Sequence, residues 1–274
     1  MKNTALTAAL SLALFACSTN TADNDLRKLN LHGAVKSILE ETYLLSEDGQ
    51  KGAKTMDNGF DHRKLFDKKG FLVRKDLFNP EGTPAGTYIY EYNAGHLLTK
   101  ETKYTPTDNI DKVYTYSYNA HHQLETQTTH TALGNVEYLD KFTHPSPTLS
   151  VQECADAAGN PLYKWEYEYD AHNNMTRKTW YAFGNIVFNT FVYNDKNQLT
   201  EQTELTDSGA TTRWQYTYDA QGNATSEVCT YPDGEQNTNL FEYEYDKRNN
   251  WTVKQVSGNG VPLYRVERTI EYNE

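Results

Sequence analysis

Residues Trp214 to Tyr231 read Trp-Gln-Tyr-Thr-Tyr-Asp-Ala-Gln-Gly-Asn-Ala-Thr-Ser-Glu-Val-Cys-Thr-Tyr, and most of the chain is a variation on this stretch. Three aromatic residues alternate with polar ones, an Asp opens a turn that contains Gly222 and Asn223, and a polar, β-branched run follows. Alternation of this kind on both sides of a Gly-Asn turn predicts a β-hairpin with one aromatic face.

This hairpin recurs along the chain with a period of about 25 residues, which indicates a repeat architecture. Aligning on the Asp or Asn that follows an aromatic residue gives the anchors Asp67, Asn93, Asn119, Asp170, Asn194, Asp219, Asp246 and Asn273. The gap between Asn119 and Asp170 spans two periods and leaves room for one degenerate copy near His144. We therefore predict one all-β domain over residues 31–274. Its fold is expected to be an antiparallel meander of about sixteen to eighteen strands, forming an extended, twisted or curled sheet.

The aromatic residues of each copy fall on one face of its first strand. Tyr167 and Tyr169 are two residues apart, as are Tyr216 and Tyr218, and side chains two apart share a face of a strand. The residues between them, such as Glu168, are polar. Because the chain contains 21 Tyr and 10 Phe, we expect the core to be built from this aromatic face.

The stretch Tyr216-Thr-Tyr-Asp-Ala-Gln-Gly-Asn223 resembles the tyrosine-aspartate repeat of the Rhs family, whose consensus is Tyr-x-Tyr-Asp-x-x-Gly-Asn. The resemblance extends over residues 58–274, and the whole chain is similar to small repeat-bearing lipoproteins of unknown function from Bacteroides-like bacteria. In the Rhs family the repeats build a long spiralling β-sheet that encloses a toxin, and carbohydrate binding has been proposed. We predict that this array is too short to close such a shell, so the enclosing function is not carried over.

Residues Val35 to Leu45 are predicted to form the first strand and to cap one edge of the sheet. Charged residues such as Lys36, Glu40 and Glu41 suit an edge that must not pair with other chains.

Residues 142–162 interrupt the repeat, since His144-Pro-Ser-Pro147 contains two prolines and lacks a Tyr-x-Tyr motif. We expect a decayed copy that loops out at the sheet margin. The alternative is a hinge that lets the two halves fold face to face as a sandwich or half-barrel.

The first sixteen residues predict a secretory signal peptide, with Lys2 followed by an apolar run from Ala5 to Ala16. Leu14-Phe-Ala-Cys17-Ser18 resembles the lipobox of bacterial lipoproteins, which implies a lipid-modified Cys17 and attachment to the outer membrane, facing the periplasm or the cell surface. Residues 17–30 are predicted to be a flexible tether. The alternative is an ordinary secreted protein in which Cys17 has no role.

Charge and motif content exclude several classes of function. The formal net charge of −11 argues against nucleic acid as a partner, because phosphate backbones require a basic surface. No nucleophile elbow, zinc-protease motif, phosphate loop or calcium loop is present, so we predict no catalytic residue, metal site or cofactor. His96, His122 and His172 follow anchors and are explained as turn residues. Cys154 and Cys229 lie three periods, and therefore about 30 Å, apart in a flat meander, so we expect free, buried thiols and no disulfide.

The aromatic face is the remaining candidate site. It either packs as a core or leaves part of its surface open to a ligand. The candidates for stacking on a sugar or a peptide are Trp165, Trp180, Trp214 and Tyr216.

We favour a non-enzymatic envelope lipoprotein that binds a glycan or a protein, or serves as a scaffold. One alternative is a structural envelope protein without a ligand. The other is a glycan hydrolase that uses carboxylates of the polar face such as Glu166 and Glu168.

Overall fold

The computed structural model describes residues 24–274, and the predicted signal peptide (1–16) and Cys17 lie outside this range. The described residues form one short helix, α1 (Asp25–Lys28), and nineteen strands. The strands are β1 (Val35–Leu45), β2 (Lys51–Lys54), β3 (Asp61–Phe66), β4 (Leu72–Phe78), β5 (Pro84–Tyr92), β6 (Leu98–Tyr104), β7 (Ile110–Tyr118), β8 (Leu124–Thr131), β9 (Val136–Ser146), β10 (Leu149–Asp156), β11 (Pro161–Tyr169), β12 (Met175–Ala182), β13 (Asn185–Tyr193), β14 (Leu199–Thr206), β15 (Thr211–Tyr218), β16 (Ala224–Thr230), β17 (Gln236–Tyr245), β18 (Trp251–Gly258) and β19 (Val261–Tyr272). No helix among these residues has the length and apolar character of a membrane span.

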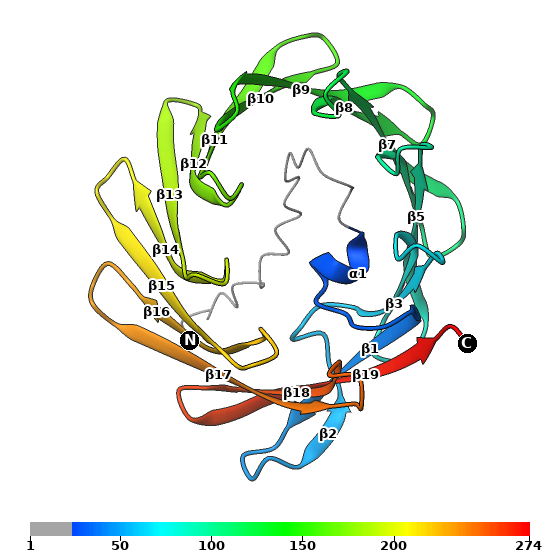
Figure 1. The fold of residues 1–274 in the computed structure, drawn as a ribbon, viewed down its shortest axis with the longest axis vertical. Helices are drawn as coiled ribbons and strands as arrows, with labels where there is room; N and C mark the ends of the chain where they lie inside the picture. Colours follow the sequence, from blue (N-terminus) through cyan, green and yellow to red (C-terminus); the bar gives the residue numbers. More distant parts are fainter. Residues whose placement is uncertain (1–23) are drawn as a thin grey trace.

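The strands close into an antiparallel barrel. From β3 onward each strand pairs with the next in sequence, and β1 pairs with both β3 and β19. This closes a ring of eighteen strands, while the short β2 pairs with β1 as an outer arm (Figure 1). The predicted antiparallel meander of hairpins is confirmed, but the prediction of an open sheet too short to close is wrong.

A register shift recurs in the ladders of successive hairpins and bends the wall of the barrel. The register shifts at the last aromatic residue of the first strand in successive hairpins, for example at Tyr169, Tyr193, Tyr218 and Tyr245. Such a shift bends a strand and increases its twist. Because the repeat supplies one shift per hairpin, the bends add up until the first and last strands meet, and closure then pairs both free edges.

The anchor residues organise the turns that follow them. Asp170 Oδ1 accepts hydrogen bonds from the backbone N–H groups of His172 and Asn174, at 2.9 and 2.8 Å. The turn also needs a residue with positive φ, which is Asn173 here and His96 or His122 in other copies. These two histidines are therefore turn residues, as predicted.

Neighbouring hairpins are joined by the last tyrosine of the repeat. The hydroxyls of Tyr118 and Tyr218 donate to the carbonyl oxygens of Leu98 and Leu199, at 2.8 and 2.6 Å, and each of these carbonyls begins the second strand of the preceding hairpin. Burial raises the pKa of Tyr118 to about 12, so its hydroxyl remains a donor at neutral pH. Tyrosine is thus favoured over phenylalanine at this position because its hydroxyl satisfies a carbonyl.

The irregular region from 142 to 162 lies within the barrel wall, so the prediction that it loops out or acts as a hinge is wrong. His144 takes the place of the last tyrosine, and its Nε2 lies 2.9 Å from the carbonyl oxygen of Leu124. Pro145 falls where the register between β9 and β10 shifts, between the pairs Leu149–Ser146 and Val151–Thr143. A proline is tolerated at such a bulge because no ladder hydrogen bond is required of it.

The N-terminal segment folds against the barrel. Residues 24–30, predicted as part of a flexible tether, include α1, which lies inside the ring of strands (Figure 1). Leu26 of α1 is buried in a small core with Leu31, Val35 and Ile38. This apolar burial stabilises the segment, which the polar composition of residues 18–25 does not reveal.

The same segment links turns that are distant in sequence. Asn24 Nδ2 donates to the carbonyl of Lys69, and Asn30 Nδ2 donates to the carbonyl of Gln221, at 2.7 and 2.9 Å. Further along, the backbone N–H of His32 donates to Asn250 Oδ1 at 2.7 Å. The chain before β1 therefore runs along the end of the barrel that carries the anchor turns.

Candidate functional site

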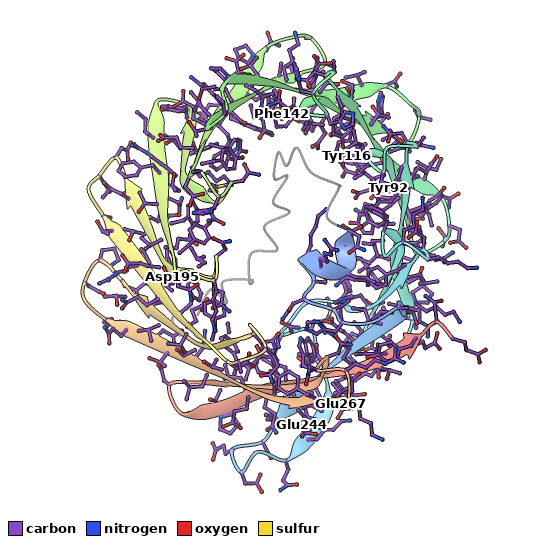
Figure 2. All side chains as sticks on the ribbon, viewed as in Figure 1. Tyr92, Tyr116, Phe142, Asp195, Glu244 and Glu267 are labelled. Atoms are coloured by element: carbon purple, nitrogen blue, oxygen red, sulfur yellow. The ribbon has the colours of Figure 1, made fainter. Side chains whose placement is uncertain are left out.

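The aromatic face of the repeats lines the inside of the barrel. The hydroxyl of Tyr92 donates to a carboxylate oxygen of Asp25 on α1 at 3.0 Å, and α1 lies within the ring. Figure 2 shows Tyr92, Tyr116 and Phe142 on the inner side of the wall. Side chains that are directly opposite on paired strands share a face, so the register extends this assignment to the other strands.

The four aromatic candidates all lie on this inner face and are partly exposed. The register places Trp165 opposite Trp180, with ring centroids 6.2 Å apart. The ammonium group of Lys178 lies 3.9 Å from the Trp165 ring centroid, a cation–π contact. Trp214 and Tyr216 lie on β15, separated from the first pair by β13 and β14. The structure therefore forms two aromatic groups on one wall and does not unite them.

A ring of polar side chains, missed in the sequence, accompanies the aromatic residues. Each second strand of a hairpin contributes one inner side chain directly opposite the middle residue of the preceding first strand, as Glu101 lies opposite Tyr90 and Glu227 opposite Tyr216. The members of this polar ring are Lys75, Glu101, Gln127, Gln152, Lys178, Gln202, Glu227 and Lys254. The signal was present in the sequence, because these residues recur with the same period of about 25.

Members of the polar ring hydrogen-bond to their neighbours on the inner wall. Gln152 accepts from the hydroxyl of Tyr167 at 2.6 Å and donates to Asp140 at 2.8 Å. Gln202 donates to Asn189 at 2.9 Å. Because aromatic rings and polar groups alternate on the same surface, the lumen can stack on one part of a ligand and hydrogen-bond to another.

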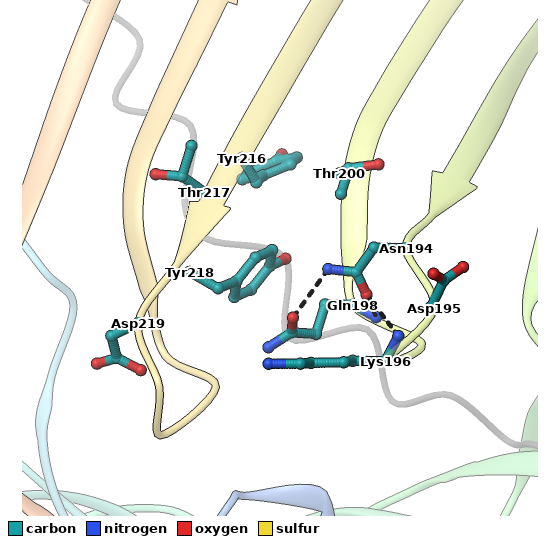
Figure 3. A pocket seen from close by; sticks show the side chains of 9 residues that line it. All are labelled: Asn194, Asp195, Lys196, Gln198, Thr200, Tyr216, Thr217, Tyr218 and Asp219. Carbon is teal, nitrogen blue, oxygen red and sulfur yellow. Dashed lines mark hydrogen bonds between the residues drawn. The ribbon is translucent and has the colours of Figure 1, made fainter.

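One cavity of about 370 Å³ opens at the anchor-turn end of β14 and β15 (Figure 3). Its lining residues are Asn194, Asp195, Lys196, Gln198, Thr200, Tyr216, Thr217, Tyr218 and Asp219. A second cavity, of about 310 Å³, shares Gln198 and Tyr218 with it. Among the aromatic candidates Tyr216 lines the first cavity, and none of the three tryptophans lines either one.

The strands that close the barrel carry charge where the repeats carry aromatic rings. We call β19, β1 and β3 the seam. Glu40 of β1 lies opposite Arg268 of β19 and His62 of β3, and Arg268 Nη2 donates to Glu40 Oε1 at 2.7 Å. The Arg268 guanidinium also lies 3.4 Å from the Trp251 ring centroid. Glu40, predicted as part of a protected edge, thus lies between two paired strands and is largely buried, with its side chain 12% exposed.

His62 is neutral at physiological pH. Burial lowers its pKa to about 4. Its Nδ1–H is placed to donate to the carbonyl of Phe60 at 3.3 Å, and its Nε2 accepts from the ammonium of Lys64 at 2.9 Å. The 3.5 Å contact between His62 Nε2 and Glu40 is therefore not an ion pair.

The other residues considered from the sequence do not form a site. Glu166 lies beside Lys164, at 2.6 Å, and accepts from the Tyr181 hydroxyl at 2.9 Å, on the outer face. Cys154 on β10 and Cys229 on β16 are buried and free. Within residues 24–274, no group of three or more His, Cys, Asp or Glu side chains is arranged to hold a metal ion.

Comparison with known proteins agrees with the repeat. Residues 193–236 match the family model described as RHS Repeat. The resemblance to Rhs-type repeats, predicted from the tyrosine-aspartate spacing, is confirmed over this segment. The comparison with curated proteins gives no match. Because the matched model describes a repeat, the comparisons favour a structural or binding protein without catalytic activity.

The comparison with solved structures gives matches at low identity. A porin-like protein from Bacteroides uniformis is 14% identical, with 86% of this chain and 96% of that chain covered and a TM-score of 0.43. A porin-like protein from Bacteroides vulgatus is 10% identical, with coverages of 87% and 98% and a TM-score of 0.35. A Photorhabdus luminescens Tc holotoxin pore is also 10% identical, with coverages of 75% and 19% and a TM-score of 0.18.

Proposed function

We propose that the protein is a non-enzymatic envelope lipoprotein whose barrel lumen binds a glycan. The main support is an arrangement that recurs on the inner faces of adjacent strands. There an aromatic ring lies opposite a polar side chain, as Tyr216 lies opposite Glu227 and Tyr167 opposite Lys178. A sugar has an apolar face of C–H groups and a rim of hydroxyls. The first can stack on the rings, and the second can bond to the polar ring.

Attachment through acyl chains at Cys17 is part of this proposal. The outward side chains of β15, Arg213, Gln215 and Thr217, are polar and exposed, which supports attachment by a lipid anchor and not by the wall itself. Replacing Cys17 with Ser should move the protein from the membrane fraction to the soluble fraction and abolish incorporation of labelled palmitate. Unchanged membrane association of the Cys17→Ser protein would contradict the anchor.

Glycan binding is tested with the purified full chain on a glycan array. Trp214→Ala should reduce binding at least about fivefold, because loss of one stacking ring costs on the order of 1–3 kcal/mol. The matched control is Phe183→Ala, since Phe183 is 87% exposed at the turn between β12 and β13 and should have no part in lumen binding. Equal loss in both variants, or unaltered binding in Trp214→Ala, would contradict binding at the aromatic wall.

The structural and hydrolytic alternatives have separate outcomes. Glu166 lies on the outer face, where Lys164 and Tyr181 already engage its carboxylate, and this arrangement gives no support to acid–base work. Glycan turnover that is lost in Glu168→Gln would nevertheless favour a hydrolase. If neither binding nor turnover is detected, a structural envelope role is favoured.

A further inference from the structure

One sector of the lumen has more positive than negative charge. Four cations face the inside along β18, β19, β3 and β4, and we call them the cationic sector: Lys64, Lys75, Lys254 and Arg268. Lys75 lies opposite both Lys64 and Tyr88, and Lys254 lies opposite Tyr243, which places both lysines on the aromatic face. All four interact electrostatically with one carboxylate, Glu40.

Glu40 is already engaged by one of these cations. Its Oε1 accepts from both Nε and Nη2 of Arg268, at 3.1 and 2.7 Å. Among the described residues, Lys64, Lys75 and Lys254 form no ion pair with a carboxylate, and Lys64 donates instead to the neutral ring of His62. Glu101, at the margin of the sector, is the other carboxylate that attracts Lys75 electrostatically. The sector therefore keeps an excess of positive charge.

Arg268 also carries positive charge that is not fully compensated by its neighbours. Its side chain is only 6% exposed, and its Nη1 is buried without a hydrogen-bond partner among residues 24–274. Burial lowers the pKa of Lys64 and of Lys254, and Arg268 lowers both further by repulsion. Uncompensated buried cations are costly, so an anion that enters beside them is stabilised.

The surroundings indicate which anion fits. Lys64, Lys75 and Lys254 are partly exposed and can reach a ligand directly, whereas Arg268 acts through its charge from beneath the surface. Aromatic rings adjoin the sector, with Trp251 against Arg268 and Tyr243 opposite Lys254. An acidic sugar offers a carboxylate beside a face of C–H groups that can stack on such rings. Cations set in a low-dielectric wall of an otherwise acidic protein also concentrate positive potential inside the barrel.

We propose that Lys64, Lys75, Lys254 and Arg268 form a subsite for the carboxylate of an acidic glycan. This inference rests on the proposed glycan-binding function and specifies its ligand class: uronate-bearing chains bind more tightly than neutral chains of equal length.

The test compares matched probes on the full chain. Uronate-bearing oligosaccharides should bind at least about tenfold more tightly than neutral ones of the same length at low salt, which corresponds to one charge-assisted contact. The preference should shrink as salt rises. In the double variant Lys75→Gln with Lys254→Gln it should fall to about twofold or less. Lys75→Arg with Lys254→Arg should retain it, and this variant also separates loss of charge from loss of folding.

Lys178→Gln is the positional control. Lys178 occupies the same slot of the polar ring on the opposite wall, over Trp165, and lies outside the cationic sector. Its replacement should leave the preference for uronates unchanged. An equal loss of preference in Lys178→Gln would overturn the assignment to this sector, as would persistence of the preference in the double Gln variant.

The remaining outcomes separate this inference from the proposed function. Equal binding of neutral and uronate-bearing chains overturns the inference and leaves glycan binding standing. Absence of binding to every glycan overturns both. A triglutamate peptide that binds as tightly as a uronate trisaccharide, with the same dependence on Lys75 and Lys254, would show a general carboxylate site and overturn the assignment to a glycan.

Discussion

The repeats and the seam solve the same problem of strand pairing by different means. Between β5 and β18 each hairpin meets a neighbour that is adjacent in sequence, and a tyrosine hydroxyl such as that of Tyr218 bonds to the preceding hairpin. At the seam β1 must find β19, and the contact between Glu40 and Arg268 joins residues 228 positions apart. In the slot where β5 carries Tyr90, β3 carries Lys64.

This difference shows where specificity is needed. Adjacent hairpins have little choice of partner, so apolar rings and one hydroxyl suffice to align them. The strands β1 and β19 are separated by the whole array of repeats, so they could pair in several registers. A buried ion pair adds little net stability, but it penalises every register that separates the two charges.

The largest effect is expected from breaking the seam at Arg268. Arg268→Met leaves Glu40 buried without its partner and should lower the free energy of unfolding by about 3–5 kcal/mol, measured as a shift of the urea midpoint. The control is Arg213→Met, which removes an ion pair with Glu201 from the outer wall, where Arg213 is 48% exposed. Its effect should be below about 1 kcal/mol.

A second substitution sharpens this result. Combining Arg268→Met with Glu40→Leu removes both charges and should recover most of the lost stability, while the penalty against other registers is lost with them. If Arg268→Met and Arg213→Met prove equally mild, the seam ion pair has no special role in closing the barrel.

The next effect concerns His62 and acid. Its folded pKa of about 4 lies below the ordinary value of 6.5, so between these values the unfolded chain binds a proton that the folded chain excludes. Stability should be unaffected above pH 6.5 and should fall as the pH drops from 6.5 to 4, by at most about 3 kcal/mol from this residue. Urea unfolding at several pH values measures this dependence.

His62→Gln removes the titrating group and should flatten the profile in this range. The difference between the two proteins isolates His62 from the many carboxylates that also titrate. Identical profiles from pH 6.5 to 4 would show that His62 is protonated in the folded barrel.

The smallest effect is expected within the repeats. Tyr218→Phe removes the hydrogen bond to the carbonyl of Leu199 and should cost about 1 kcal/mol in thermal or urea unfolding. Tyr90→Phe is the matched control, because the Tyr90 hydroxyl makes no hydrogen bond to another described residue. A loss of equal size in both would mean that the hydroxyl at the last position does not join hairpins.

The structure of the repeat could be predicted from short stretches of the sequence. The alternation around Tyr216 and Tyr218, the turn at Asp219 and the bounds of β1 all follow from pattern and turn chemistry. The aromatic face and its candidate residues were predicted. Its position on the inside of a barrel was not, because the curvature of the sheet decides whether the rings pack against another layer or line a lumen. The polar ring was overlooked because Gln, Glu and Lys on a strand normally indicate a solvated face.

The sequence by itself determined the unit: a hairpin of about 25 residues whose aromatic spacing, Asp or Asn anchor and positive-φ turn residue specify one local structure. Only the tertiary structure decided that these units close. Closure depends on the sum of small bends at residues such as Tyr169 and Tyr218, and the total bend cannot be predicted from any local sequence pattern. For the same reason the role of Glu40 was hidden, because a charge at a presumed edge becomes a buried partner of Arg268 only when the two ends of the chain meet.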